Sequence, residues 1–170
     1  MKTWVLLAVL FTLTGCAEAR PSPREYALRL ETEGNLCGAT TVGPNEIETA
    51  VHCLGAKLRL VNDTPVQIVS SRRIGDDRVR VTLSGISFKS WAKPGRAEQG
   101  DHVHWWGQPM GVPFVYREGV VVMVAAGGLV IDATICHGDS GSGLFNDAGE
   151  LVGVVSAMSN GYGCTFMLAH

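Results

Sequence analysis

The sequence predicts an all-β protein. Six short segments between residues 26 and 158 are rich in apolar residues, several of them alternating with polar ones, and Gly, Pro, Asn and Asp separate them, which is typical of β-strands. No stretch combines apolar residues at helical spacing with helix caps. The chain has 170 residues, enough to bury a core in one domain or in two very small ones.

The predicted strands fall into two halves of similar size. They occupy residues 26–31, 56–61, 65–70, 78–83, 119–124 and 149–158. Residues 37–54 carry a cysteine at or near each end and are expected to form a hairpin. A polar segment with Pro and Gly, residues 89–100, is the expected connection between the halves. The first half is therefore expected to span 26–88 and the second 101–170.

The charge of the chain gives no sign of a nucleic-acid partner. The net charge is −2 and the pI about 6.2, and no basic run is present. Arg72, Arg73, Arg78 and Arg80 are interpreted as one solvated strand and its turn. We expect no nucleic-acid binding.

The N-terminal residues are typical of an export signal. Residues 1–15 contain one positive charge, at Lys2, and an apolar stretch too short to span a bilayer as a helix. The ending "LTGC" resembles the bacterial lipobox, which implies that Cys16 is lipidated and begins the mature chain, followed by a linker, 16–25. A plain signal peptide with an incidental cysteine is the alternative. We expect an exported, membrane-anchored lipoprotein that faces the periplasm or the cell exterior, with soluble secretion as the alternative.

Export changes the meaning of the four remaining cysteines, at positions 37, 53, 136 and 164. An even number of cysteines in an oxidising compartment favours two disulfides. Three pairings are possible, and cysteine counting alone does not choose among them.

Two short motifs carry the residue types of nucleophilic catalysis. Ser140 lies between Gly138 and Gly141 in "TICHGDSGSGLF", where residues without a Cβ leave room for a substrate to approach the hydroxyl. His52 precedes Cys53 in "TAVHC". These motifs resemble the histidine motif "TAAHC" and the serine motif "CxGDSGGP" of trypsin-like, chymotrypsin-fold serine peptidases, and the order His, Asp, Ser is also that family's order.

The resemblance runs from about Cys37 to the C-terminus and implies two small antiparallel β-barrels packed together. It also implies a catalytic triad in which His52 is the base, Ser140 the nucleophile and an aspartate at the start of a strand the acid. Asp77 is the preferred aspartate because apolar residues follow it at +2, +4 and +6. Asp76, offset by one residue, is the alternative.

Further roles are implied by the same resemblance. The amides of Gly138 and Ser140 would form the oxyanion hole, and Asp139 would anchor the turn. The cysteines would pair as Cys37–Cys53 and Cys136–Cys164. The substrate pocket would be lined by Thr134, Ser156, Ala157 and Met158, none of them a carboxylate. We therefore expect a polypeptide substrate cleaved after uncharged, small or medium apolar side chains rather than after Lys or Arg.

Other functions are compatible with some of these residues. His102 and His104 alternate onto one strand face, and with Cys136 and His137 they suggest a zinc site; we nevertheless expect no metal and no cofactor. A binding protein that keeps the peptidase fold without turnover is the strongest competing function, because Ser142 stands where the family usually has a second glycine.

Overall fold

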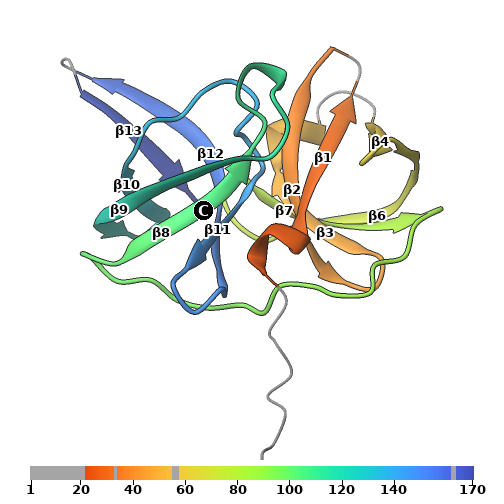
Figure 1. Ribbon diagram of the computed structural model, residues 1–170, viewed down its shortest axis with the longest axis horizontal. Coiled ribbons are helices and arrows are strands. Elements are labelled where there is room, and N and C mark those ends of the chain that lie inside the picture. Colours follow the sequence, from red (N-terminus) through yellow and green to blue (C-terminus); the bar gives the residue numbers. More distant parts are fainter. Residues whose placement is uncertain (1–21, 33, 55–57, 162–163) are drawn as a thin grey trace, which may run out of the picture.

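The computed structural model describes residues 22–32, 34–54, 58–161 and 164–170, and it consists almost entirely of antiparallel strands (Figure 1). The elements are η1 (Pro23–Tyr26), β1 (Ala27–Thr32), β2 (Leu36–Gly43), β3 (Glu46–Ala50), η2 (Val51–Leu54), β4 (Leu58–Val61), β5 (Thr64–Pro65), β6 (Gln67–Arg73), β7 (Arg78–Ser84), β8 (His102–Gly107), η3 (Pro109–Gly111), β9 (Val115–Ala125), β10 (Gly128–Asp132), β11 (Gly143–Asn146), β12 (Leu151–Gly161) and β13 (Cys164–Ala169). The three η elements are single 3₁₀ turns.

Strands β1 to β7 form one sheet in the order β5-β4-β1-β2-β3-β7-β6. Its inward positions alternate with outward ones, and the inward residues of β7 are Val79, Val81 and Leu83, all buried. β3 and β7 are antiparallel, with Ala50 opposite Arg78. This register places the end of β3 beside the start of β7.

Strands β8 to β13 form a closed barrel in the order β10-β13-β12-β11-β8-β9. The two β-structures lie side by side, and the chain between them runs along one edge of both (Figure 1). Each has its own apolar core, and Val154 of β12 packs into the core of the first sheet. A third cluster, Tyr26, Ala92, Phe145 and Leu151, joins η1 and the connecting segment to the barrel.

The predicted all-β fold of two packed β-structures is confirmed. Among the described residues, only the second β-structure is a closed barrel. The first is an open sheet whose edge strands are β5 and β6.

One sequence interpretation is wrong, because two of the four arginines are not simply solvated. Arg78 and Arg80 of β7 bind the buried carboxylate of Glu48 on β3, with Nη2–Oε distances of 2.5 and 2.6 Å. Glu48 and Arg80 are direct partners in the β3–β7 ladder, so the register pairs the opposite charges.

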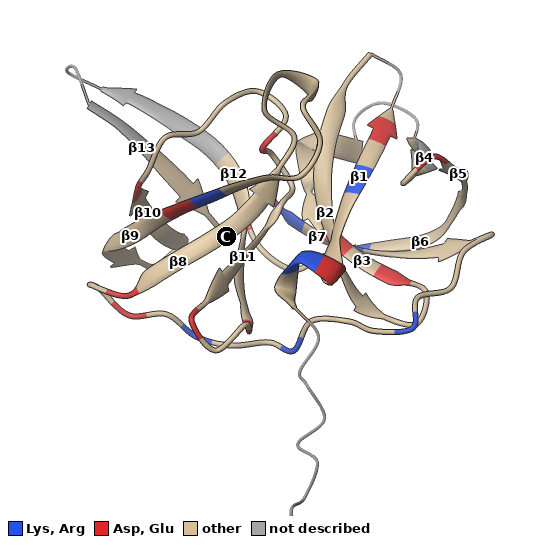
Figure 2. Ribbon diagram, in the orientation of Figure 1, with Lys and Arg blue, Asp and Glu red and all other residues tan. Residues whose placement is uncertain are grey.

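Lys and Arg are otherwise dispersed over the molecule among Asp and Glu (Figure 2). No helix among the described residues has the length and apolar character needed to cross a bilayer.

Candidate active site

His52 and Asp77 meet because the β3–β7 ladder brings their elements together. His52 lies on η2, directly after β3, and Asp77 directly precedes β7. The Val51 amide donates to the Asp77 carbonyl at 3.1 Å, which extends the ladder by one step. His52 Nδ1 then lies 2.7 Å from Asp77 Oδ2, and the His52 amide donates to Oδ1 at 3.2 Å. The imidazole is thereby oriented by the carboxylate of Asp77, whereas Asp76 is exposed and makes no described contact with His52.

Ser156 of β12 is a third partner of this pair, and sequence reasoning missed this contact. Its hydroxyl donates to Asp77 Oδ2 at 2.5 Å. Burial raises the pKa of the Asp77 carboxyl, but the hydrogen bonds from Ser156 and His52 and the charge of His52 outweigh it, so the net pKa is lowered. Asp77 is therefore ionised at neutral pH. The serine lies 79 residues away in sequence, and no local pattern signals the contact.

The turn that carries Ser140 is tied to both β-structures by backbone hydrogen bonds. The Ser140 carbonyl accepts from the Gly38 amide of β2 at 2.7 Å. The Gly141 amide donates to Val155 O of β12 at 2.7 Å. The turn is therefore positioned against the first sheet as well as the barrel, so that Ser140 and His52, from different β-structures, line one cleft.

Gly138 has a backbone conformation that favours glycine, with φ +100°, and a Cβ there would clash with the Gln108 carbonyl. In the described part of the chain, neither the Gly138 amide nor the Ser140 amide donates a hydrogen bond. Two backbone N–H groups beside a serine are thus available to a negatively charged oxygen.

Asp139 is completely buried behind the turn. Its Oδ2 accepts from the Cys136 amide at 2.9 Å, and Arg117 Nε of β9 lies 3.3 Å from the same oxygen. Burial raises the pKa of Asp139, while the Cys136 amide and the Arg117 charge act in the opposite direction. Arg117 also donates to the Thr134 carbonyl at 3.3 Å, so its guanidinium lies against the segment that precedes the nucleophile.

Ser142, the departure from the family motif, is accommodated by a glycine in the other β-structure. Its hydroxyl is buried and packs against Gly38, where a Cβ would overlap Ser142 Oγ. The extra side chain in the turn is thus compensated by the absence of one on β2.

The cleft beside these residues has a volume of about 470 Å³. It is lined by Gly34, Asn35, Leu36, Cys37, His52, Met110, Gly111, His137, Gly138 and Ser140. Of the expected substrate pocket, Thr134 is exposed and the Ser156 hydroxyl faces Asp77. The side chains of Ala157 and Met158 lie outside the described residues, so the predicted pocket stays a prediction.

Cys37 and Cys53 form a disulfide that links β2 to η2, next to His52. Cys136 is half-buried, with its Sγ 3.5 Å from Arg117 Nη2, and it has no disulfide partner among the described side chains. The side chain of Cys164 lies outside those described, as does the whole of Cys16. The Cys136–Cys164 bridge therefore stays a prediction, which peptide mapping under non-reducing conditions tests.

Removing the first bridge should destabilise the protein without changing its fold. The bridge closes a loop of 16 residues, and loops of this length contribute about 3 kcal/mol by restricting the unfolded chain. We expect the Cys37→Ser, Cys53→Ser double variant to lose about 2 to 4 kcal/mol in urea unfolding. An unchanged unfolding midpoint would show that the bridge does not restrain this loop.

The histidines considered for a zinc site are arranged differently from the sequence expectation. Among the described residues, His102 and His104 group with Asp147 rather than with Cys136 and His137. His137 instead lines the cleft beside Ser140.

The chain is similar in structure to several solved proteases. An inactive form of Rv3671c from M. tuberculosis has 18% identity and a TM-score of 0.70, with 86% of this chain and 82% of that chain covered. The MamO protease domain of Magnetospirillum magneticum has 18% identity and a TM-score of 0.68 over 88% of this chain and 93% of that one. A Glu endopeptidase has 15% identity and a TM-score of 0.68 over 92% and 89%. These matches show a chymotrypsin-like double-barrel fold.

A comparison with curated protein sequences finds no match. The family model described as "Trypsin-like peptidase domain" matches residues 37–154, which include His52, Asp77 and Ser140. Because that match covers more than half of the chain, this protein belongs to the trypsin-like peptidase domain family.

Proposed function

We propose that this protein is an exported serine endopeptidase that hydrolyses peptide bonds through His52, Asp77 and Ser140. The observation that carries the proposal is the 2.7 Å contact between His52 Nδ1 and Asp77 Oδ2 in the cleft that Ser140 also lines. Serine is a poor nucleophile at neutral pH and needs such an oriented imidazole to accept its proton.

The proposed reaction begins with attack of Ser140 Oγ on the carbonyl carbon of the substrate. Because Asp77 binds His52 Nδ1, the other ring nitrogen, Nε2, is left to take the serine proton. The oxygen that becomes negative is stabilised by the amides of Gly138 and Ser140. His52 then gives the proton to the leaving amine, which leaves an acyl group on Ser140. Water, activated by His52, hydrolyses this ester and restores the enzyme.

Labelling by a fluorophosphonate probe tests the proposal without a known substrate. The probe reacts with an activated serine hydroxyl. We expect one label per folded molecule, at Ser140, and no label after denaturation. Ser70→Ala, which changes an exposed serine of β6, is the matched control and should label normally. Absence of label on folded wild-type protein would contradict the proposal.

A catalytically silent binding protein is the second candidate, and Ser142 in the nucleophile turn is the observation in its favour. The space that Gly38 leaves for Ser142 weakens this argument, although the buried Ser142 hydroxyl has no hydrogen-bond partner among the described residues. A binding protein would retain peptide affinity and show no fluorophosphonate label.

The charge near the expected pocket supports cleavage after uncharged side chains. Arg117 donates to the Thr134 carbonyl, and its one described acidic partner, Asp139, is buried behind the turn. A lysine or arginine side chain in a pocket beside Thr134 would approach this guanidinium without a carboxylate of its own.

A peptide library should therefore be cleaved mainly after small or medium apolar residues. Peptides with Lys or Arg at the same position should be cleaved at least about 10-fold more slowly, since one unpaired charge costs more than about 1.4 kcal/mol. Sequencing of the cleavage products measures the preference. Products that end mainly in Lys or Arg would overturn it.

We further propose that lipid on Cys16 anchors the exported protein to a membrane. Cys16→Ser should move the protein from the detergent phase to the aqueous phase in a detergent partition, because it removes the acyl chains that provide stable attachment. A wild-type protein found wholly in the aqueous phase, with a mature N-terminus other than Cys16, would contradict this anchor.

A further inference from the structure

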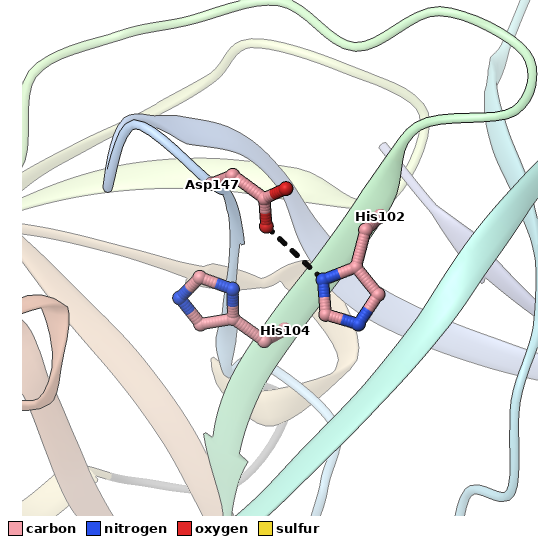
Figure 3. A group of neighbouring side chains, drawn as sticks. All are labelled: His102, His104 and Asp147. Atoms are coloured by element: carbon pink, nitrogen blue, oxygen red, sulfur yellow. Dashed lines mark hydrogen bonds and ion pairs between the residues drawn. The ribbon is translucent and has the colours of Figure 1, made fainter.

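A cluster of two histidines and one aspartate lies on the outer face of the barrel, apart from the cleft. His102 and His104 occupy alternate positions of β8, so their side chains point to the same face of the sheet. β8 pairs with β11, with His104 opposite Phe145. Asp147 follows β11 in the turn to β12, and this pairing brings its carboxylate to the two rings (Figure 3). One donor atom from each residue lies within 4.8 Å of the others.

His104 is set in aromatic surroundings that favour its neutral form. Its ring stacks on Tyr116 and Phe145 at centroid distances of 5.9 and 6.2 Å and meets the edge of Trp106 at 5.4 Å. Burial lowers the pKa of His104, as does the charge of His102, against the smaller opposite effects of Asp147 and Glu118.

The two nitrogens of His102 face two different carboxylates. Nδ1 lies 3.0 Å from Asp147 Oδ1, and Nε2 lies 3.5 Å from Glu118 Oε2. Glu118 in turn accepts from the Tyr116 hydroxyl at 3.0 Å. A histidine that binds metal through one nitrogen commonly donates the other N–H to a carboxylate held by a further hydrogen bond. Glu118 and Tyr116 occupy these outer positions.

A simple ion pair accounts for His102 and Asp147 but not for His104. In the part of the chain that the structure describes, neither ring nitrogen of His104 has a hydrogen-bond partner, although the ring lies beside the other two groups. The turn itself does not need Asp147, because Asn146 Oδ1 accepts from the amides of Ala148 and Glu150 at 3.1 and 3.0 Å. The Asp147 carboxylate thus has no part in holding the turn, and its described partner is His102.

We propose that His102, His104 and Asp147 bind a divalent transition-metal ion of the zinc class. Two imidazoles and one carboxylate are a ligand set that Zn²⁺ accepts, and a fourth position is open to water. Donor atoms of a tetrahedral zinc site are about 3.3 Å apart, from bonds of about 2.0 Å. In this cluster the donor atoms lie within 4.8 Å of one another, so they must move closer together to bind the ion. The Asp147 side chain is 76% exposed in its turn and has the freedom to move toward the two rings. A cavity of about 440 Å³ adjoins His104 and Asp147 and leaves room for the fourth ligand.

Titration of metal-free, untagged protein with Zn²⁺ tests this site. We expect one ion per chain, with a Kd of about 10 μM or lower by calorimetry, and a rise in melting temperature of about 5 to 10 °C at a free-metal concentration 100-fold above Kd. His104→Ala and Asp147→Asn should each weaken binding at least about 30-fold. His170→Ala and Asp132→Asn, which remove a histidine and an aspartate outside the cluster, should bind as the wild type does.

Two further measurements separate this site from other zinc ligands. Co²⁺ bound at the cluster should give visible absorption without a thiolate charge-transfer band, because no cysteine is among the ligands. Glu118→Gln should weaken binding about 10-fold, as expected for an outer hydrogen-bond partner. Ser140→Ala should bind Zn²⁺ as tightly as the wild type, so that this test is independent of the proposed peptidase activity.

Three results would overturn the proposal: a Kd of about 1 mM or weaker, a thiolate band with Co²⁺, or variants of the cluster that bind as tightly as their controls. The melting temperature of each metal-free variant shows whether it is folded. Asp147 lies in an exposed turn held by Asn146, so Asp147→Asn provides the decisive comparison should His104→Ala fail to fold.

Discussion

Ser140→Ala and His52→Ala should each remove nearly all peptide hydrolysis, with turnover reduced by roughly 10⁵ to 10⁶. Ser140 supplies the attacking oxygen and His52 the base that takes its proton, so neither works without the other. The double variant should therefore be only slightly less active than either single variant. Turnover of a cleavable peptide, measured at saturating concentration, gives these ratios.

The control for this prediction is Ser70→Ala, on the exposed strand β6, which should keep full activity. Both active-site variants should fold, because Ser140 is held in its turn by backbone hydrogen bonds and η2 by the Cys37–Cys53 bridge. Circular dichroism checks this. Full activity in a folded Ser140→Ala protein would exclude a serine peptidase mechanism through this residue.

Asp77→Asn should reduce turnover by about 10⁴, and Asp76→Asn should have little effect. The asparagine removes the negative charge that holds the His52 tautomer and stabilises its protonated form, while the nucleophile and the turn amides remain. Asp76 is exposed, and the described structure shows no contact between it and His52. Comparing the two variants in one assay tests the choice between adjacent aspartates, and a larger loss for Asp76→Asn would move the acid by one position.

The pH dependence of stability gives a second measurement on Asp77. Its pKa is lowered in the folded protein, so the unfolded chain binds the proton more readily and the ionised group stabilises the fold. This contribution is fully present above about pH 4, the pKa of an aspartate in an unfolded chain, and is lost as the pH falls through the lower folded pKa. The stability difference between wild type and Asp77→Asn should shrink in the same range. A difference independent of pH would mean that Asp77 is not stabilised as an anion.

Much of the fold was accessible from the sequence because its signals are local. Alternating apolar residues at 78–83 predicted β7, and its inward residues are buried. The strand at 26–31 matches β1 within one residue at each end. The 3₁₀ turn that carries His52 was not predicted, since a single turn of four residues has no periodicity to detect. Among the described residues only the second β-structure is closed into a barrel by hydrogen bonds, and no local sequence signal indicates this difference.

Residue types and their order were sufficient to nominate His52, Asp77 and Ser140, because two of the three lie in short motifs with fixed neighbours. Their assembly depends on contacts between segments far apart in sequence. The β3–β7 register brings His52 to Asp77, and the Gly38–Ser140 hydrogen bond fixes the serine turn against the first sheet. The Ser156–Asp77 contact, the space that Gly38 leaves for Ser142 and the meeting of Asp147 with His102 and His104 likewise arise only from strand pairing and packing. A linear sequence states which groups are present, whereas distances between them follow from ladder register and core packing, which are properties of the folded chain as a whole.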